Sequence, residues 1–350
     1  MNLREVLTGA LVMAPMTKGS NLPYRRLCVE LGARVTISEM TVARRLKQRK
    51  KGEFALIRRF EGEPFFGVQL AGTNPEELGW AAALVESRGA DLVDLNCGCP
   101  IDHFTHKGIG AALGRQPARI RRIVEAMKTA VTNIPVTVKL RLGWNDEMRN
   151  VLDQARAAVD GGADAIFVHG RTRNARYRFA ADWDAIGSVV AAVPVPVVGN
   201  GDLLFPQDIA DARARSGCAG VMTARGVLIK PWLFREATEG YREVSGEDRL
   251  AIYRRYVTLA KEHWGRGRVR DRARRTVRPL AYGLLVSLRK AAARRHVPWS
   301  ANPRAGPQHA HAAGAAARPP GWRRPRLPHG LSGERPRGRS RRCAPARRSA

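Results

Sequence analysis

The sequence contains little cysteine, with five residues in a chain of 350. This low number argues against a disulfide framework, and Cys97 and Cys99 lack a second cysteine pair or histidine cluster at zinc-binding spacing, so we expect no structural metal. No run of 18 or more apolar residues occurs, so we expect no membrane span. The N-terminus carries Glu5 and leads into no secretory hydrophobic region, so we expect no signal peptide. These absences favour a reducing intracellular compartment, the cytoplasm and also the nucleus.

Acidic residues are scarce in the last part of the chain. Residues 266–350 contain 23 Lys and Arg but only 2 Asp and Glu, a net charge of +21, whereas residues 1–265 carry +9 of the total of +30. The pI near 11.3 therefore describes mainly this segment. Its composition is rich in Arg, Ala, Pro and Gly, which cannot bury a substantial core. We expect residues 266–350 to form a disordered basic tail.

Short apolar runs typical of buried strands alternate with helical patterns over residues 6–241. Eight such units, rich in Val, Ile and Leu, predict an α/β fold: a (β/α)8 TIM barrel, with a C-terminal helical segment starting over 242–265. A doubly wound sheet is the alternative, but it would need a Gly-x-Gly-x-x-Gly turn, and only Gly19 follows the first run. The expected strands are 11–16, 34–39, 64–70, 92–96, 136–141, 165–169, 195–200 and 220–224. The expected helices are 22–31, 41–51, 75–87, 118–131, 148–159, 183–193, 206–215 and 226–241.

Polar side chains stand at the carboxyl ends of these expected strands, where the active sites of such barrels lie. Each one alone has a structural explanation, since Lys139 could be a rim charge and His169 a hydrogen-bonded structural histidine. A full set in phase with the strands points instead to one reaction face. Its members are Pro15, Met16, Thr17, Glu39, Gln69, Asn96, Cys99, Lys139, Arg141, His169, Asn200, Gly201, Asp202, Ala224 and Arg225.

The most informative strand end is the stretch 92–100, which reads Leu-Val-Asp-Leu-Asn-Cys-Gly-Cys-Pro. Its apolar opening predicts a buried strand, and Pro100 prevents the hydrogen-bond ladder from continuing. Cys99 is therefore either a reactive group where a strand stops or a small buried hydrophobe in a tight turn. The glycine-rich segment that follows, which includes Lys107, suits a flexible loop over a substrate rather than a packed element.

The last two strand ends indicate a phosphate site. The segments 200–202 and 224–226 combine small residues that expose backbone N–H groups, a helix start and an arginine. Gln69 and Lys139 could reach the polar edge of an isoalloxazine ring, where a cation stabilises the anionic reduced form. Together these features favour FMN as the ligand, and a sugar phosphate bound by an aldolase or isomerase is the alternative.

These motifs resemble those of the tRNA-dihydrouridine synthases. The resemblance covers about residues 6–265 and is carried by Ala-Pro-Met-Thr (14–17), Gly-Val-Gln-Leu (67–70), Asp-Leu-Asn-Cys-Gly-Cys-Pro (94–100), Val-Lys-Leu-Arg (138–141), His-Gly-Arg (169–171), Gly-Asn-Gly-Asp (199–202) and Met-Thr-Ala-Arg-Gly (222–226). Cys-Pro-Ile-Asp (99–102), Lys-Pro-Trp-Leu-Phe (230–234) and Glu-His-Trp-Gly (262–265) further resemble the eukaryotic branch that acts on uridine 47 in the tRNA variable loop.

The resemblance implies a barrel that reduces uridine in tRNA to 5,6-dihydrouridine with FMN and NADPH. Hydride would pass from reduced FMN to C6 of uracil, and Cys99, rather than Cys97, would protonate C5. A thiol with an ordinary pKa is mostly protonated at neutral pH and can donate. FMN contacts are implied for Pro15, Met16, Thr17, Gln69, Lys139, His169, Asn200, Gly201, Asp202, Ala224 and Arg225. Substrate contacts are expected of Asn96, Lys107, Arg141 and Arg171.

RNA binding also needs basic surface, because a uridine in folded tRNA must leave its stack while phosphates are held. Two basic stretches, 44–51 and 171–178, could supply it or could be solvated charges. Family members continue after the Glu-His-Trp-Gly motif into a helical domain that helps to hold tRNA, whereas this sequence changes composition at Arg266. We favour a shifted reading frame or mis-predicted exon over an evolved basic RNA-binding arm, and we expect the chain to be a fragment without the family's zinc-finger extension.

Two other function classes stay open. A different FMN barrel, such as a dihydroorotate-type oxidoreductase, would share the phosphate site but would not predict Cys-Pro followed by His-x-x-Lys-Gly. A non-enzymatic RNA-binding protein, or an inactive truncated fragment, would depend on charge and not on Cys99. The exact uridine, mRNA as an additional substrate and the choice between NADPH and NADH are open at this stage.

Overall fold

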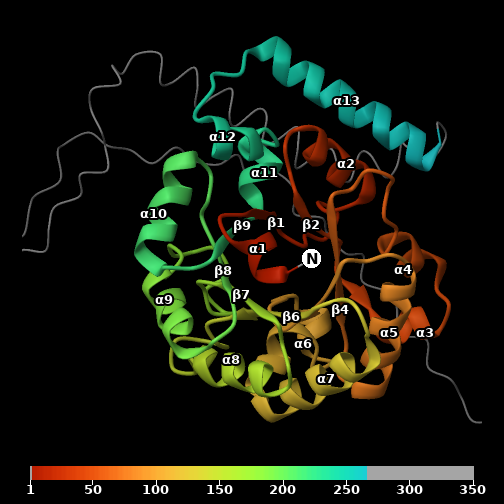
Figure 1. The fold of residues 1–350 in the computed structure, drawn as a ribbon, viewed down its shortest axis with the longest axis vertical. Coiled ribbons are helices and arrows are strands. Elements are labelled where there is room, and N and C mark those ends of the chain that lie inside the picture. Colours follow the sequence, from red (N-terminus) through yellow and green to blue (C-terminus); the bar gives the residue numbers. More distant parts are fainter. Residues whose placement is uncertain (1, 266–350) are drawn as a thin grey trace, which may run out of the picture. The chain divides into compact units, whose positions relative to one another are not determined.

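The computed structural model describes residues 2–265, and the expected tail, 266–350, lies outside the described residues. Eight parallel strands form a barrel inside a ring of helices (Figure 1). They are β1 (Leu11–Met13), β2 (Val35–Ile37), β4 (Phe65–Ala71), β5 (Leu92–Asn96), β6 (Val136–Arg141), β7 (Ala165–His169), β8 (Val197–Asn200) and β9 (Gly220–Thr223). Strand β2 pairs with β1 on one side and with β4 on the other, which closes the barrel. The predicted (β/α)8 TIM barrel is confirmed.

Side chains alternate between two apolar layers along each strand, because successive residues of a strand point to opposite faces. Within β5, Val93 and Leu95 belong to the larger core between strands and helices, whereas Leu92 belongs to a second cluster with Phe65 and Phe167. This second cluster fills the inside of the barrel. On β4 to β8 the inward positions near the carboxyl ends are polar, so the alternation also decides which side chains face the barrel mouth; they are Gln69, Asn96, Arg141, His169 and Asn200.

The helices around the barrel begin where the sequence supplies caps. The main ones are α2 (Leu22–Glu30), α5 (Pro75–Ser87), α7 (Pro117–Ala130), α8 (Val151–Asp160), α9 (Trp183–Ala192) and α10 (Pro206–Ser216). Proline stands in the first turn of α2, α5, α7 and α10, where a missing backbone N–H costs nothing. The Asn74 and Asp182 side chains accept backbone N–H groups at the starts of α5 and α9.

Two predicted helices are wrong, because each is divided in the structure. The expected helix 41–51 is a short strand β3 (Thr41–Val42), a helix α3 (Ala43–Lys47) and a helix α4 (Lys51–Leu56). The β-branched pair at its start extends the ladder of β4, and Arg49 has a left-handed backbone, with φ 55°, between the two helices. The expected helix 226–241 is divided into α11 (Arg225–Ile229) and α12 (Leu233–Glu239), since Pro231 disfavours helical geometry at Lys230.

The loop expected to be flexible after Cys99 is a packed element in the structure. It contains a short helix α6 (Asp102–Thr105) and a 3₁₀ helix η1 (Gly110–Arg115). Ala111 and Leu113 of η1 are buried, and the Ala111 backbone N–H donates to the Cys99 carbonyl oxygen at 3.0 Å. The segment therefore holds the backbone of Cys99 in place through this hydrogen bond.

A helix before the first strand closes the amino-terminal end of the barrel. This helix, α1 (Leu3–Leu7), buries Leu7 fully against the inner apolar cluster, and Leu3 and Val6 pack beside it. The Gly9 backbone N–H donates to the Ala219 carbonyl oxygen at 2.8 Å, which ties the segment to the start of β9. Access to the inside of the barrel is therefore from the carboxyl ends of the strands.

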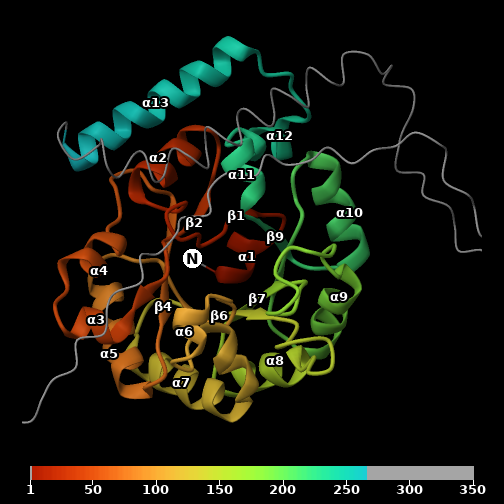
Figure 2. The ribbon, with the colours of Figure 1, turned by 180° about the vertical axis from the view of Figure 1, so that it is seen from behind.

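The expected helical segment over 242–265 contains one long helix, α13 (Gly246–Trp264), which packs along α2 outside the ring of strands (Figure 2). The Tyr24 and Tyr256 rings meet edge to face with centroids 5.6 Å apart. Ion pairs Arg26–Glu262 and Arg255–Glu30 flank this contact at 2.9 Å and 2.6 Å. Within residues 2–265, no helix is both long and apolar enough to cross a membrane.

Candidate active site

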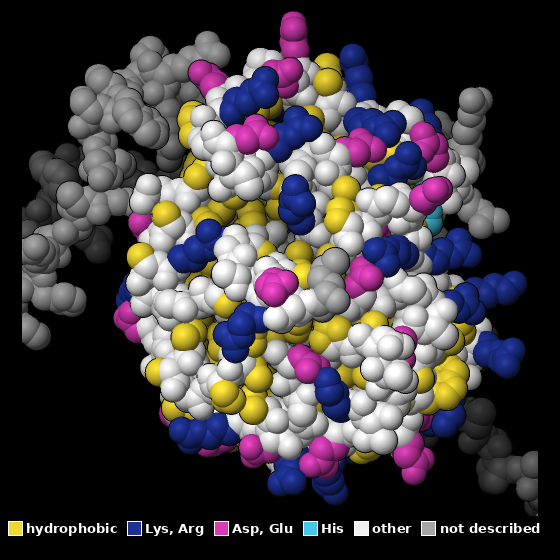
Figure 3. Space-filling model, viewed as in Figure 1, with side chains coloured by type: hydrophobic (Ala, Val, Ile, Leu, Met, Phe, Trp, Pro, Cys, Tyr) yellow, Lys and Arg dark blue, Asp and Glu magenta, His cyan; other side chains and the backbone are white. Residues whose placement is uncertain are grey.

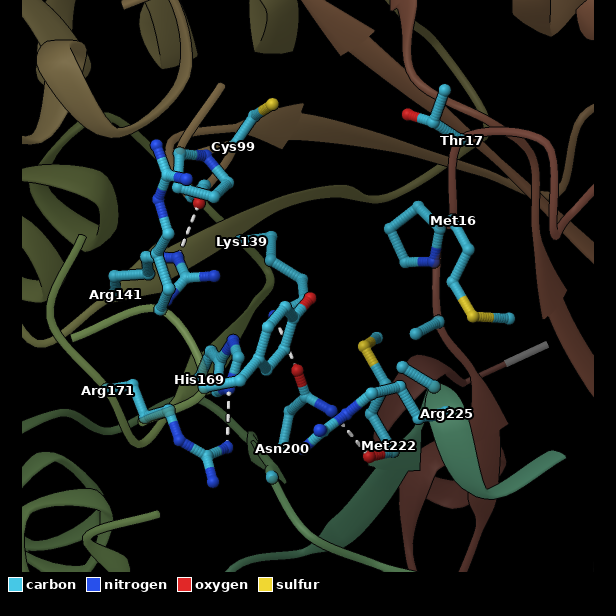
Figure 4. Close-up of a pocket in the computed structure, with 18 of the residues that line it drawn as sticks. Met16, Thr17, Cys99, Lys139, Arg141, His169, Arg171, Asn200, Met222 and Arg225 are labelled. Carbon is cyan, nitrogen blue, oxygen red and sulfur yellow. Dashed lines mark hydrogen bonds between the residues drawn. The ribbon is translucent and has the colours of Figure 1, made fainter. Parts of the chain in front are cut away.

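A cavity of about 580 Å³ lies at the carboxyl ends of the strands, within the size range of small-molecule sites (Figure 4). It gathers side chains that are far apart in the sequence. All but one of the residues that the sequence analysis assigned to FMN, catalysis or substrate line it: Pro15, Met16, Thr17, Gln69, Asn96, Cys99, Lys139, Arg141, His169, Arg171, Asn200, Gly201, Asp202, Ala224 and Arg225.

Lys107 is the exception, because it does not line the cavity, and its expected contact with the substrate stays a prediction. Its side chain is exposed on the surface after α6, where the ammonium nitrogen lies 3.4 Å from the His103 Nε2 atom. The cause is the folding of 101–115 into α6 and η1, which turns Lys107 away from the cavity.

Inward-facing cations of β6 form one wall of the cavity. The Lys139 ammonium group donates to Asn200 Oδ1 at 3.1 Å, and Asn200 in turn donates to the Met222 carbonyl oxygen. Burial, with the charge of Arg141, lowers the pKa of Lys139 to about 7. Burial therefore favours the neutral amine of Lys139, and a bound anion would favour the charged ammonium.

His169 ends β7 and lies beside this wall. Burial lowers the pKa of its imidazole well below the ordinary value, and the charges of Arg141 and Lys139 lower it further. Its Nε2 atom lies 3.2 Å from a guanidinium nitrogen of Arg171. A neutral ring can accept a hydrogen bond from Arg171, so His169 acts here as a hydrogen-bonding group rather than as a cation.

Asp202 holds the cations on the other side of the mouth. Its carboxylate accepts hydrogen bonds from Arg171 and, at 2.9 Å, from Arg225. Partial burial opposes ionisation, but the Arg171 hydrogen bond and the two positive charges outweigh it and lower the pKa of Asp202. Asp202 has a left-handed backbone, with φ 55°, directly after Gly201. The tight turn thus points one carboxylate at two guanidinium groups.

The turn that carries Cys99 is fixed by hydrogen bonds. The Asn96 Oδ1 atom accepts the backbone N–H groups of Gly98 at 3.2 Å and Cys99 at 2.9 Å. The Arg141 Nε atom donates to the Gly98 carbonyl oxygen at 2.6 Å. Burial raises the pKa of the Cys99 thiol above its ordinary value. Cys99 therefore presents a protonated thiol to the cavity at neutral pH.

Cys97 differs from Cys99 in position. It is 1% exposed and belongs to the outer core, and it is absent from the cavity lining. Its backbone N–H continues the ladder to the Lys139 carbonyl oxygen at 2.9 Å. The two cysteines, two residues apart, thus have different surroundings, and of the two only Cys99 lines the cavity.

Several cavity residues were missed by sequence reasoning. Met40, Met222, Leu203 and Leu228 add an apolar part to the lining. Tyr177 also lines the cavity, with its ring centroid 4.3 Å from the Arg225 guanidinium carbon. The signal for Tyr177 was an aromatic residue inside the basic stretch 171–178, whereas the apolar residues gave no local signal.

Two loops meet at the mouth through Asp102. This carboxylate, three residues after Cys99, forms ion pairs with Arg173 and, at 3.2 Å, with Arg176. Part of the basic stretch 171–178 is therefore already paired with an acid. Within residues 2–265, no cluster of three or more His, Cys, Asp or Glu side chains is arranged to hold a metal ion.

The other basic stretch lies along an edge of the barrel. Lys and Arg side chains project beside α3 and α4, at the right of Figure 3. This patch comprises Arg44, Arg45, Lys47, Arg49, Lys50 and Lys51, all of which are exposed. Arg45 pairs with Glu53 at 3.2 Å. The rest of the patch presents a positive surface to solvent.

Gly226 should tolerate no side chain, because a Cβ atom there would lie 2.0 Å from the Leu203 carbonyl oxygen and 2.7 Å from Thr223 Oγ1. We expect Gly226→Ala to lower the free energy of unfolding by about 2 kcal/mol, as overpacking at a rigid backbone does. Gly52→Ala is the control, since its Cβ meets nothing within 4 Å in α4. Denaturant unfolding measures both variants, and equal stability would mean that the 203–226 contact is looser than described.

Comparisons with known proteins give one family. The dihydrouridine synthase (Dus) family model matches residues 12–296. A Cryptococcus neoformans protein named tRNA-dihydrouridine(47) synthase, with NAD(P)(+) in its name, is 40% identical over 274 residues, which are 73% of this chain and 38% of that protein. Two further relatives carry the same name with the ending "-like". The protein from Oryza sativa subsp. japonica is 42% identical over 73% of this chain and 38% of its own length. The protein from Homo sapiens is 40% identical over 74% of this chain and 40% of its own length. The chain thus spans about two-fifths of the length of these curated relatives.

Solved structures share the barrel at low sequence identity. A 2-naphthoyl-CoA reductase in complex with 2-naphthoyl-CoA superposes with a TM-score of 0.53 at 12% identity, over 66% of this chain and 50% of that one. The 6-hydroxypseudooxynicotine amine oxidase of Pseudomonas geniculata N1 superposes with a TM-score of 0.51 at 15% identity, over 66% of this chain and 47% of that one. These likenesses concern the fold alone.

Proposed function

Since this chain belongs to the dihydrouridine synthase family, we propose that its barrel is the catalytic part of a tRNA-dihydrouridine synthase, which reduces uridine to 5,6-dihydrouridine with FMN and NADPH. One observation carries the proposal: a protonated thiol, Cys99, and a buried cation, Lys139, line the same cavity. A reduction of a C=C bond needs a hydride and a proton. Bound FMN would supply the hydride, Lys139 would favour the anionic form of the reduced ring, and Cys99 would supply the proton. The names of the relatives favour uridine 47 as the target.

The cavity residues fit FMN. The Lys139 ammonium has three donors, and among the described residues one hydrogen bond is found for it, to Asn200. The remaining donors face a cavity that also presents Arg141, Arg171 and Arg225. Such a cationic set suits a ligand that bears a phosphate and becomes anionic on reduction. The methionine and leucine side chains offer apolar surface to a flat ring system.

The residues divide by the part of FMN that they would hold. Arg225 and the backbone of the 200–202 turn would bind the phosphate, and Gln69 and Lys139 would bind the polar edge of the ring. Pro15, Met16 and Thr17 line the cavity, and Met16 and Thr17 lie on the side across from Cys99 and Arg141 (Figure 4). Bound FMN, reduced by NADPH, supplies the hydride that C6 of uracil receives.

Cys99 supplies the proton in this proposal. As C5 of uracil gains electron density, the thiol transfers its proton to that carbon and becomes a thiolate. Desolvation raises the thiol pKa, so Cys99 stays protonated while it waits for substrate. The Arg141 guanidinium lies close enough to lower that pKa in part, and it would stabilise the thiolate once the proton has left.

The size of the cavity limits how an RNA substrate could reach it. A cavity of about 580 Å³ admits a single base but no duplex, so the target uridine must leave its stack. The exposed cations of 44–51, together with the exposed Arg176 and Arg178, would hold phosphates during that step. We place the protein in the cytoplasm and the nucleus, and a fluorescent fusion would test that location.

We expect the purified full chain to show flavin absorption and Arg225→Ala to weaken FMN affinity about tenfold or more, because a charge-assisted hydrogen bond to phosphate is lost. Arg121→Ala is the control, since Arg121 pairs with Glu125 on the exposed face of α7. Quenching of FMN fluorescence measures both affinities. A colourless protein that cannot be reconstituted with FMN would refute the proposed function. Dihydrouridine formed in free uridine but not in tRNA would point to a different FMN oxidoreductase.

A further inference from the structure

One buried carboxylate adjoins the site without lining the cavity. Asp94 is 0% exposed and lies two residues before Asn96 on the inward face of β5. In the sheet register it stands opposite Gln69 of β4 and Thr137 of β6. Asp94 therefore lies in a polar row that joins three neighbouring strands inside the barrel.

Hydrogen bonds connect Asp94 to the Cys99 turn in one direction. Gln69 Nε2 donates to Asp94 Oδ2 at 2.7 Å, and Asn96 Nδ2 donates to Gln69 Oε1 at 2.6 Å. Asn96 Oδ1 then accepts the backbone N–H groups of the turn, at 2.9 Å for Cys99. On its other side Asp94 Oδ1 accepts the Thr137 hydroxyl at 2.8 Å. An ionised carboxylate can only accept hydrogen bonds. The side-chain amides of Gln69 and Asn96 therefore each have a single orientation in which both the nitrogen and the oxygen find a partner.

We propose that Asp94 is a positioning residue for the reaction: as a buried acceptor it fixes the amides of Gln69 and Asn96. Through Asn96 it holds the turn that presents Cys99 to the cavity. This role rests on the proposed function, but it concerns hydrogen bonds of the chain itself. Without the acceptor, the Gln69 amide nitrogen is left unsatisfied in a buried place, which favours rotation of Gln69 toward the cavity and releases Asn96.

The inference separates the role of the acceptor from the role of the charge. In Asp94→Leu, no acceptor is left for Gln69. In Asp94→Asn, the Oδ1 atom can still accept from Gln69, while the new amide nitrogen donates to the Thr137 hydroxyl, which can accept as well as donate. The conservative variant should therefore keep the chain of amides intact, although it removes a negative charge near Lys139. Thr137→Val is a matched control, because it removes the neighbour on the opposite side of Asp94.

The test is alkylation of Cys99 in the full chain with iodoacetamide across pH 6 to 10, with the Cys99 peptide quantified by mass spectrometry. Burial keeps the wild-type thiol of Cys99 protonated. If the turn is released, Cys99 becomes more exposed, the pH midpoint of its alkylation rate falls, and alkylation at pH 8 becomes faster. We expect Asp94→Leu to react at least about threefold faster, and Asp94→Asn and Thr137→Val to follow the wild type. Circular dichroism confirms that each variant is folded.

Two results would overturn the inference. One is an unchanged alkylation profile in folded Asp94→Leu, and the other is an Asp94→Asn profile as altered as that of Asp94→Leu, which would assign the effect to charge. In turnover assays, a positioning role predicts that Asp94→Leu lowers kcat about tenfold or more with KM for tRNA within about twofold. Alkylation needs neither FMN nor RNA, so failure of the proposed function would leave this test readable.

Discussion

Replacing Cys99 with alanine is expected to lower dihydrouridine formation by about a hundredfold or more, because general acid catalysis contributes 10² to 10⁴ in rate. The cause is specific to the proton transfer, since the alanine variant keeps the cavity cations and should bind FMN as the wild type does. Reduction of the bound flavin by NADPH should also continue. The measurement is single-turnover formation of dihydrouridine in tRNA, alongside the rate of flavin reduction.

The pH dependence of the wild type follows from the raised thiol pKa. A raised pKa means that Cys99 is protonated, and active as an acid, at every pH below it, and that activity is lost as the pH rises through it. The alkaline limb should therefore lie above the pKa of about 8.5 of a free cysteine.

Cys97→Ala is the control for Cys99→Ala, because Cys97 is buried in the outer core away from the cavity. Equal activity of the two alanine variants would remove Cys99 from the mechanism.

Replacing Lys139 with methionine is expected to have opposite effects on stability and on binding. The pKa of Lys139, near 7 in the folded chain, lies far below the ordinary value of 10.5 that it recovers on unfolding. Between these two pH values the unfolded chain binds a proton that the folded chain does not, so stability rises with pH across this window. Below pH 7 the folded chain carries the full cost of a buried charge. Methionine fills a similar space and carries no charge.

We expect Lys139→Met to raise the free energy of unfolding of the flavin-free protein by on the order of 3 kcal/mol at pH 7, with a gain that shrinks toward pH 10.5. FMN affinity should fall at least about tenfold, because the cation that faces the ligand is gone. Urea unfolding at pH 7 and pH 10 and FMN titration measure the two effects.

The control for Lys139→Met is Lys128→Met, which breaks the partly exposed pair with Asp164 and should change stability by less than about 1 kcal/mol. A Lys139→Met protein that is less stable than the wild type at pH 7 would show that the hydrogen bond to Asn200 outweighs desolvation. Unchanged FMN affinity would place the ligand elsewhere in the cavity.

The barrel was predictable because its signal is local and repeated. Most strands are short runs rich in Val, Ile and Leu, and five main helices (α2, α5, α7, α9 and α10) begin at a side-chain cap or a proline that the sequence displays. The errors occur where tertiary contacts or single residues decide. Pro231 was a visible reason to end a helix, but the left-handed backbone at Arg49 has no such signal, because a glycine is the usual residue there. The strand Thr41–Val42 forms only because β4 is beside it.

The same difference between local signals and tertiary contacts decides which site residues could be predicted from the sequence. Residues at the carboxyl ends could be placed from the strand pattern, since all of them share one end of a parallel barrel. Lys107 could not be placed, because its direction depends on how 101–115 folds against Cys99. Asp94 was missed for another reason: it looks like one polar letter in an apolar strand, and its importance arises from partners on β4 and β6 that only the register brings together.

The helix α1 that seals the amino-terminal end of the barrel has a consequence for the order of events. In the described part of the chain, Leu7 and the inner apolar cluster close the cavity at the amino-terminal end of the barrel. The cavity therefore opens only at the carboxyl ends of the strands. Under the proposed function, a nicotinamide and a uracil must both reach the same flavin through that doorway, and each arrives attached to a bulky body. We expect them to bind in turn, because a cavity of about 580 Å³ that holds FMN leaves little room for both. Each turnover would then consist of two successive binding events, first of the nicotinamide and then of the uracil. The flavin-bound protein would hold the two electrons between these events.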